Sequence, residues 1–183
     1  MDITSEYVAA LRSCLTGEGD YTELSARLQA LDGGERSAHI FFALAGMALH
    51  LAARRRFPGG YTDADVIRLV GQARVMLGEG YEIDPLVAEA TLRGALGDTA
   101  ATANLEGLEM GTALFPLLIV LLEQEGITTD RMDDFLAEVL PLAEAWLARD
   151  DLLRAFRTAY LRLIYAVDCR STYSSWACRG VRY

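Results

Sequence analysis

Two histidines, His39 and His50, are the side chains in this sequence best suited to acid–base or metal chemistry, and both lie in one apolar stretch. They are eleven residues apart, which in an α-helix corresponds to ~1100° of rotation and ~16 Å of rise, so they share a face but cannot bind one metal ion together. The Glu-x-x-His spacing of di-iron bundles is absent from the sequence. We therefore expect no metal and no cofactor. Each histidine is interpreted as a group beside the core that is hydrogen-bonded to a neighbouring element.

Three further side chains complete the candidate ligand site. Glu109 stands just before a very apolar stretch, where it could project into a pocket and titrate above its usual pKa; a solvated helix end is the alternative. Arg54 and Arg55 could hold a phosphate or carboxylate, although a position at a helix end accounts for their charge without a ligand. No Gly-rich phosphate loop or Gly-x-Ser-x-Gly elbow accompanies them. We predict no catalytic residue, and the candidate ligand-binding residues are His39, His50, Glu109, Arg54 and Arg55.

The end of the chain, residues 169–183, differs in composition from the rest. It contains no acidic residue and no leucine, and its three aromatic side chains are interleaved with three arginines. Cys169 and Cys178 each precede an arginine, which favours the thiolate, but no base accompanies them. Three interpretations of this tail stay open: it folds back onto the acidic body, which we favour, it docks on a partner subunit, or it contacts nucleic acid or is processed. Its candidate partner-binding residues are Tyr173, Trp176, Arg179, Arg182 and Tyr183.

The composition predicts a folded chain with an acidic body. Of the 183 residues, 52% are hydrophobic and 23% are charged, which is enough apolar surface to offset the entropy of ordering. The net charge of −9 disfavours binding to nucleic acid and to anionic membranes. Residues 1–148 hold 10 Arg against 23 acidic residues, whereas residues 149–183 hold 7 Arg against 3 acidic residues. The charges of body and tail are therefore opposed.

Helices are the elements that must position these residues, because no stretch shows the period-two alternation of a half-buried strand. Caps, glycines and prolines delimit the expected helices, which cover 5–16, 20–31, 35–56, 62–77, 84–97, 104–125, 130–147 and 152–167. Pro116 is expected to kink or restart the sixth of these, and Pro141 to bend the seventh. The expected fold is an all-α, irregular or orthogonal bundle of seven or eight helices over residues 1–168, followed by the tail 169–183.

Hydrophobic patterning indicates which helix faces are buried. Residues 40–49 are apolar or Gly throughout, and residues 114–122 are nearly as apolar, so we expect these two helices at the centre of the bundle. Both are interpreted as buried helices rather than membrane spans, because the uncharged segment 37–53 includes His39 and His50, and the segment 110–122 is shorter and contains Pro116. The helix at 62–77 is amphipathic, with Arg68 and Gln72 opposite an apolar stripe made of Val66, Leu69, Val70, Ala73, Met76 and Leu77.

Part of the chain resembles a known group of proteins. The motifs are Tyr61-Thr62 with Asp65-Val66-Ile67-Arg68, then Glu82-Ile83-Asp84-Pro85 with Ala88-Glu89, and finally Ala95-Leu96-Gly97-Asp98. Over residues 61–98 the sequence is similar to small uncharacterised helical proteins of high-GC Gram-positive bacteria. The resemblance implies a helical domain in a bacterial cytoplasm and implies no activity.

Two functional classes remain in view. Three cysteines and the lack of a cationic, apolar leader favour a cytoplasmic location with reduced thiols. The first hypothesis is a non-enzymatic interaction module that forms a homodimer or binds another protein, without nucleic acid or membrane. The alternative is a protein, or minor enzyme, that binds a small apolar ligand in a pocket between the helices at 35–56 and 104–125. An enclosed cavity reached by at least two of His39, His50 and Glu109 would favour the alternative.

Overall fold

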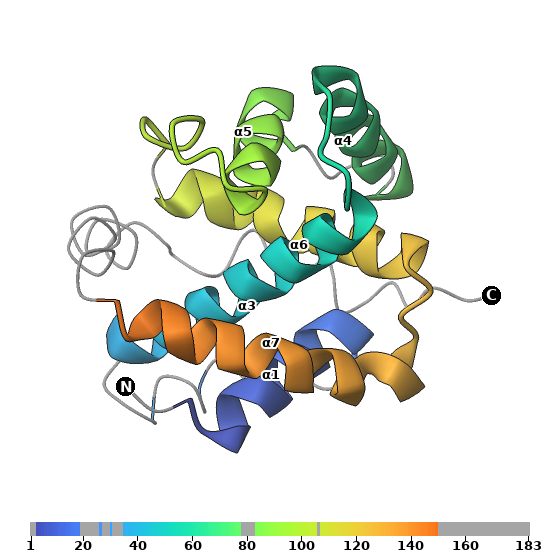
Figure 1. Ribbon diagram of the computed structural model, residues 1–183. Helices are drawn as coiled ribbons and strands as arrows, with labels where there is room; N and C mark the ends of the chain where they lie inside the picture. The colour runs from blue at the N-terminus through green and yellow to red at the C-terminus, as the bar shows by residue number, and fades with distance from the viewer. Residues whose placement is uncertain are drawn as a thin grey trace. The chain divides into compact units, whose positions relative to one another are not determined.

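The computed structural model describes residues 3–18, 26, 30, 35–77, 83–105 and 107–149. All regular structure within these ranges is helical, which confirms the predicted all-α class (Figure 1). The expected helices over 20–31 and 152–167 fall outside the described residues, apart from Ala26 and Ala30, and so does the whole tail. The elements are α1 (Ser5–Thr16), α3 (Glu35–Arg56), α4 (Asp63–Leu77), α5 (Pro85–Ala95), α6 (Gly107–Gln124), the short 3-10 helix η1 (Thr129–Arg131) and α7 (Met132–Leu147).

Local signals in the sequence explain where several helices begin and end. Gly17 ends α1 with a φ of 69°, a left-handed conformation that glycine adopts without strain. Thr62 and Asp65 cap α4 reciprocally, since the Thr62 N–H donates to Asp65 Oδ2 at 3.0 Å and the Asp65 N–H donates to Thr62 Oγ1 at 3.3 Å. Asp84 caps α5, where its Oδ1 accepts from the N–H groups of Leu86 and Val87 at 2.8 and 3.3 Å.

The helix α6 differs from its prediction at two points. It begins at Gly107 rather than at Asn104, because residues 99–104 form turns in which Asp98 Oδ1 accepts from the Ala101 N–H at 3.3 Å. The helix also does not restart at Pro116, which lies inside it. Proline removes one hydrogen bond to the preceding turn, but apolar side chains on both sides of Pro116 are buried and keep this segment helical.

The chain divides into two compact units, and the division falls inside α3 and α7. One unit contains Met1–Leu44 and Leu140–Tyr183, so its described elements are α1, the first part of α3 and the last part of α7. Tyr7 of α1 is fully buried there, and its hydroxyl donates to Ser37 Oγ of α3 at 3.1 Å. This unit therefore joins α1 to α3 through a buried polar contact.

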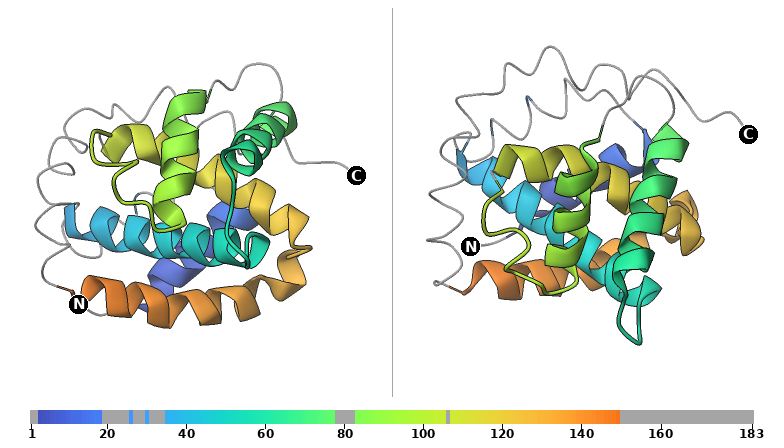
Figure 2. Two further views of the ribbon diagram at one scale, coloured as in Figure 1. Left: turned by 45° about the horizontal axis from the view of Figure 1, so that its top comes forward. Right: turned by 90° about the horizontal axis from the view of Figure 1, so that it is seen from above.

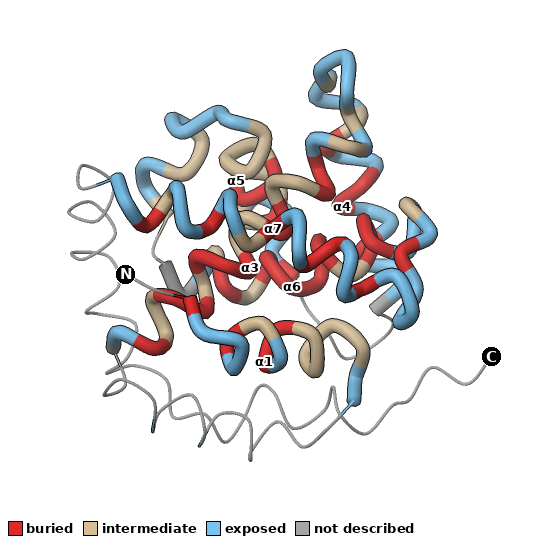
Figure 3. The backbone as a smooth tube through the Cα atoms, turned by 60° about the horizontal axis from the view of Figure 1, so that its bottom comes forward, coloured by how far each residue is buried: buried red, intermediate tan, exposed pale blue. Residues whose placement is uncertain are grey.

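The other unit contains Ala45–Val139 and is organised by α4, α5 and α6. The helices α4 and α5 lie next to each other, and both pack on α6 (Figures 1 and 2). Arg93 of α5 also reaches α4, with Nη2 at 3.1 Å from Asp63 Oδ1. Figure 3 shows buried and exposed positions alternating along these helices, as expected for amphipathic elements. Their buried apolar side chains include Val66, Leu69, Val70, Ala73, Ala88, Leu92, Leu117, Leu118 and Leu121.

Candidate functional site

The face of α4 that points away from the core carries apolar side chains. Among the described residues, five large hydrophobic side chains are exposed, and three of them belong to α4: Ile67 (55%), Val75 (83%) and Met76 (42%). The periodicity of α4 predicts that Met76 belongs to the buried stripe, and this prediction is wrong. At ~100° per residue, Met76 lies about 70° from the centre of the stripe formed by Val66, Leu69, Val70 and Ala73, at its edge.

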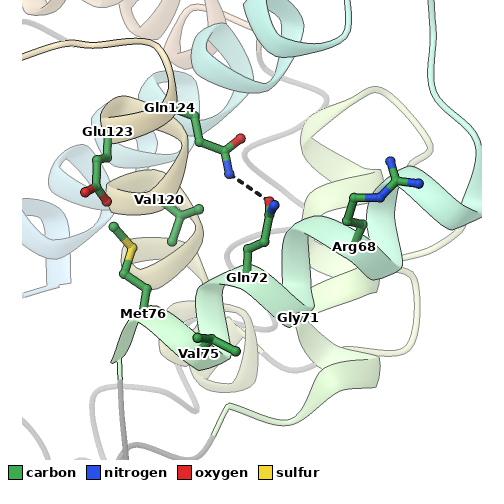
Figure 4. A pocket seen from close by; sticks show the side chains of 8 residues that line it. All are labelled: Arg68, Gly71, Gln72, Val75, Met76, Val120, Glu123 and Gln124. Atoms are coloured by element: carbon green, nitrogen blue, oxygen red, sulfur yellow. Dashed lines mark hydrogen bonds between the residues drawn. The ribbon is translucent and has the colours of Figure 1, made fainter.

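An open groove runs between α4 and α6 beside these side chains. It has a volume of about 610 Å³ and is largely open to solvent, and Figure 4 shows the side chains that line it. Val120 of α6 is only 2% exposed and lies at the floor of the groove, while Val75 and Met76 come from α4. The polar side chains around it are Arg68, Gln72, Glu123 and Gln124, and Gly71 completes the lining. An apolar floor with a polar rim is the usual composition of a protein-binding surface.

Two hydrogen bonds between side chains connect the walls of the groove. Gln124 Nε2 donates to Gln72 Oε1 at 2.8 Å across the groove, as the dashed line in Figure 4 shows. Arg56, at the end of α3, donates from Nε to Gln124 Oε1 at 3.0 Å. The Gln124 amide therefore links α3, α4 and α6. Because both ends of the amide are used, its orientation is defined by the two contacts together.

The two charged residues of the groove, Arg68 and Glu123, lie toward opposite ends of it (Figure 4). Arg68 is 66% exposed and lies 3.0 Å from Asp65 Oδ1, one turn earlier on α4. Hydrogen bonds from Thr62, together with the charge of Arg68, hold the pKa of the Asp65 carboxyl below its ordinary value. One end of the groove therefore carries the Arg68–Asp65 ion pair, and the other carries the Glu123 side chain.

The predicted ligand-binding residues of this unit take part in other contacts, and none of them lines the groove. His50 Nδ1 lies 2.6 Å from the Ala95 carbonyl oxygen, so Nδ1 carries the proton and donates to the end of α5. Arg55 forms an ion pair with Glu138, and its guanidinium lies 5.5 Å from the centre of the Phe135 ring. Arg54 is exposed at the end of α3. Glu109 is exposed in the first turn of α6 rather than projecting inward.

His39 belongs to the other unit. Its ring is half-buried and lies 5.9 Å from the Trp146 ring, tilted by 34°. Burial lowers the pKa of His39 below its ordinary value, because it disfavours the charged imidazolium. Cys14 of α1 is also partly buried, and burial raises the pKa of its thiol to about 11, so this thiol is protonated at neutral pH.

The predictions for the end of the chain concern residues that the structure does not describe. The tail residues Tyr173, Trp176, Arg179, Arg182 and Tyr183 lie outside the described residues, as do Cys169 and Cys178. In the described part of the chain, no group of three His, Cys, Asp or Glu side chains is arranged to hold a metal ion.

The same ranges contain one helix, Arg36–Arg56, that is long and apolar enough to cross a membrane, and 56% of its apolar window is buried. The bent pair of α6 and α7 would pass the same test only if counted as one span. Buried core helices of soluble proteins satisfy these criteria too.

The residues of the groove were not selected from the sequence, although a signal was present. Ile67, Gly71 and Val75 recur every four residues on the face opposite the apolar stripe, where polar residues are expected. Two β-branched apolar side chains around a glycine on an outward face indicate a contact surface.

Comparison with known proteins adds nothing to this geometry. No protein-family model matches the chain, and no curated protein or solved structure is significantly similar to it.

Proposed function

We propose that this chain is a non-enzymatic helical interaction module that binds a protein partner through α4 and the groove between α4 and α6. The observation that carries the proposal is the pair of exposed apolar side chains Val75 and Met76, which line a groove with an apolar floor and a polar rim; Ile67, two turns before Val75 on α4, is exposed as well. Large apolar side chains gathered on one exposed helix face are typical of interaction sites, whereas single scattered ones are ordinary.

The shape of the groove favours a protein over a small molecule. Its volume of about 610 Å³ falls within the range of ligand sites. A small-molecule site, however, encloses ~70–90% of its ligand, and this groove is open along one side. Val75 lines the groove but is 83% exposed, so it lies at the open rim. A helix or loop laid across α4 would bury most of Val75, whereas a small ligand within the groove would cover only the part of it that faces the groove.

The proposal includes the finer expectations from the sequence. The bundle has seven or eight helices with α3 and α6 at its centre, the location is cytoplasmic, and the resemblance to small helical proteins of high-GC Gram-positive bacteria reflects common descent. The alternative function, an apolar ligand bound between α3 and α6, would use His39, His50 or Glu109. The contacts of His50 with Ala95 and the exposure of Glu109 favour structural and solvated roles for these two residues instead.

Site-specific photo-crosslinking in cells tests the proposal. A photoreactive phenylalanine analogue at position 75 is expected to give discrete protein adducts, since Val75 stands on the proposed surface. The matched control is position 86, because Leu86 is 75% exposed but lies on α5 and does not line the groove. Val75→Asp should abolish adducts formed from position 67. Equal labelling from positions 75 and 86, or no adduct from either, would overturn the proposal.

A further inference from the structure

The two helices that run through the boundary between the compact units each contain, close to that boundary, a residue that weakens a helix. In α3 the boundary follows Leu44, and in α7 it follows Val139. Gly46 and Pro141 stand two residues beyond these points. We propose that Gly46 and Pro141 form a hinge at which the two units change their mutual orientation. This hinge is independent of the proposed interaction function, because every residue that lines the groove belongs to one unit.

Gly46 is not required by its surroundings. Its φ is not in the left-handed region, and a Cβ added to it would meet no atom within 4 Å, so alanine would fit there. Glycine inside a helix is nevertheless less favourable than alanine, because it loses more conformational freedom on folding. In an α-helix the Gly46 N–H donates to the Phe42 carbonyl, and this hydrogen bond spans the boundary. The helix is therefore weakened where it passes from one unit to the other.

Pro141 has the corresponding effect in α7. Proline has no N–H, so the hydrogen bond to the Ala137 carbonyl that would span the boundary in this helix is not formed. Sharp bends in helices occur mainly at proline and glycine. Pro141 is exposed and Gly46 is half-exposed. Water can therefore solvate the backbone groups that bending would free at either position.

The position of both residues at the boundary carries the proposal. Gly71 of α4 has the same open surroundings as Gly46 but lies inside one unit, so open space alone does not identify a hinge. The chain crosses between the units in α3 and in α7, and each crossing contains a residue that weakens the hydrogen bond across it. Rotation of one unit against the other requires both helices to bend, and hinges are typically a few residues that absorb the change in backbone angles.

Pulsed dipolar electron paramagnetic resonance on the full-length chain tests the hinge. Spin labels are attached at positions 9 and 74, which are exposed and lie one in each unit, after the three native cysteines are replaced by alanine. The distribution of distances between the labels is expected to narrow in Gly46→Ala and in Pro141→Ala, and to narrow most in the double variant. Gly71→Ala is the matched control, because it adds the same methyl group to an open helical position inside one unit. It should leave the distribution unchanged.

Hydrogen exchange of the same variants gives a second measurement. Gly46→Ala is expected to slow exchange of the amides of residues 46–50 about fivefold relative to those of α4, whereas Gly71→Ala should slow exchange in α4. A distance distribution that is equally narrow in the unaltered chain and in all variants would overturn the proposal. So would a distribution that Gly71→Ala narrows as much as Gly46→Ala does, because the effect would then be a general gain in stability. Circular dichroism shows whether each variant keeps its helices.

Discussion

His39 packs against Trp146, and burial lowers its pKa below the ordinary value of 6.5. The native state therefore binds this proton less readily than the unfolded state does. The neutral His39 therefore stabilises the native state fully when the pH is above the pKa that His39 has in the unfolded chain. This contribution to the free energy of unfolding is lost as the pH falls below that pKa. We predict that urea unfolding becomes easier between about pH 7 and about pH 5, within the range in which histidine titrates.

Carboxylates complicate this measurement only at lower pH. Asp65, Asp130 and Glu18 have lowered pKa values through hydrogen bonds and neighbouring arginines, so their contributions are lost below their ordinary values of 3.8, 3.8 and 4.5. The variant His39→Gln keeps an amide in place of the imidazole and should flatten the curve above about pH 5. An equally steep curve in the variant would assign the effect to another group.

For individual residues, the sequence predicts the kind of contact that a histidine makes but not its hydrogen-bond partner. It predicted a hydrogen bond from a histidine beside the core to a neighbouring element, and His50 makes one to the Ala95 carbonyl. The identity of Ala95 depends on how α5 packs, which no local pattern specifies. Arg55 was expected to serve a ligand or a helix end, and its pairing with Glu138 depends in the same way on the approach of α7.

Among the helices, boundaries were predictable where a cap or a glycine is present. The bounds of α1 and α3 agree with the expected ranges, and Asp84-Pro85 was correctly identified as the start of α5. The start of α6 was not, because the turns before it contain residues that are also compatible with a helix. Met76 shows the limit of periodicity: a position at the edge of an apolar stripe is buried only if a neighbour covers it.

The cap of α5 gives a prediction at this scale. Asp84→Ala removes the acceptor for the N–H groups of Leu86 and Val87, which should lower the free energy of unfolding by ~1 kcal/mol. Thr4 provides a matched control, because it occupies the N-cap of α1 but makes no side-chain hydrogen bond there. Thr4→Ala should therefore change the free energy of unfolding by a few tenths of a kcal/mol or less. Equal losses in the two variants, measured by denaturant unfolding, would contradict the capping argument.

For the molecule as a whole, the fold class followed from composition and periodicity, whereas the candidate site did not. The groove joins residues 68–76 of α4 to residues 120–124 of α6, about fifty residues apart in the sequence. Helical patterning shows which face of each helix is apolar, but not which two helices lie side by side. Polar residues such as Gln72 and Gln124 become a site only through that adjacency, and nothing in their local sequence distinguishes them from solvated side chains.

The net charge of −9 separates two ways in which copies of this chain could associate. If a second copy binds at the exposed face of α4, two acidic molecules repel at long range while the contact at Val75 and Met76 is apolar. Salt screens the repulsion, with a Debye length of ~10 Å at 0.1 M, so the dissociation constant should fall as sodium chloride rises from ~0.01 to ~0.15 M.

If instead the arginine-rich residues 149–183 dock on the acidic body of a partner, the dissociation constant should rise as the salt concentration rises. That contact joins a segment with 7 Arg and 3 acidic residues to a body with 10 Arg and 23 acidic residues, and screening weakens attraction between them. Sedimentation equilibrium across the same salt series therefore discriminates between the two associations. Val75→Asp serves as the control, since it should remove the salt-strengthened dimer and leave a tail-mediated one intact. A dimer that salt weakens and Val75→Asp does not affect would place the self-association in the tail.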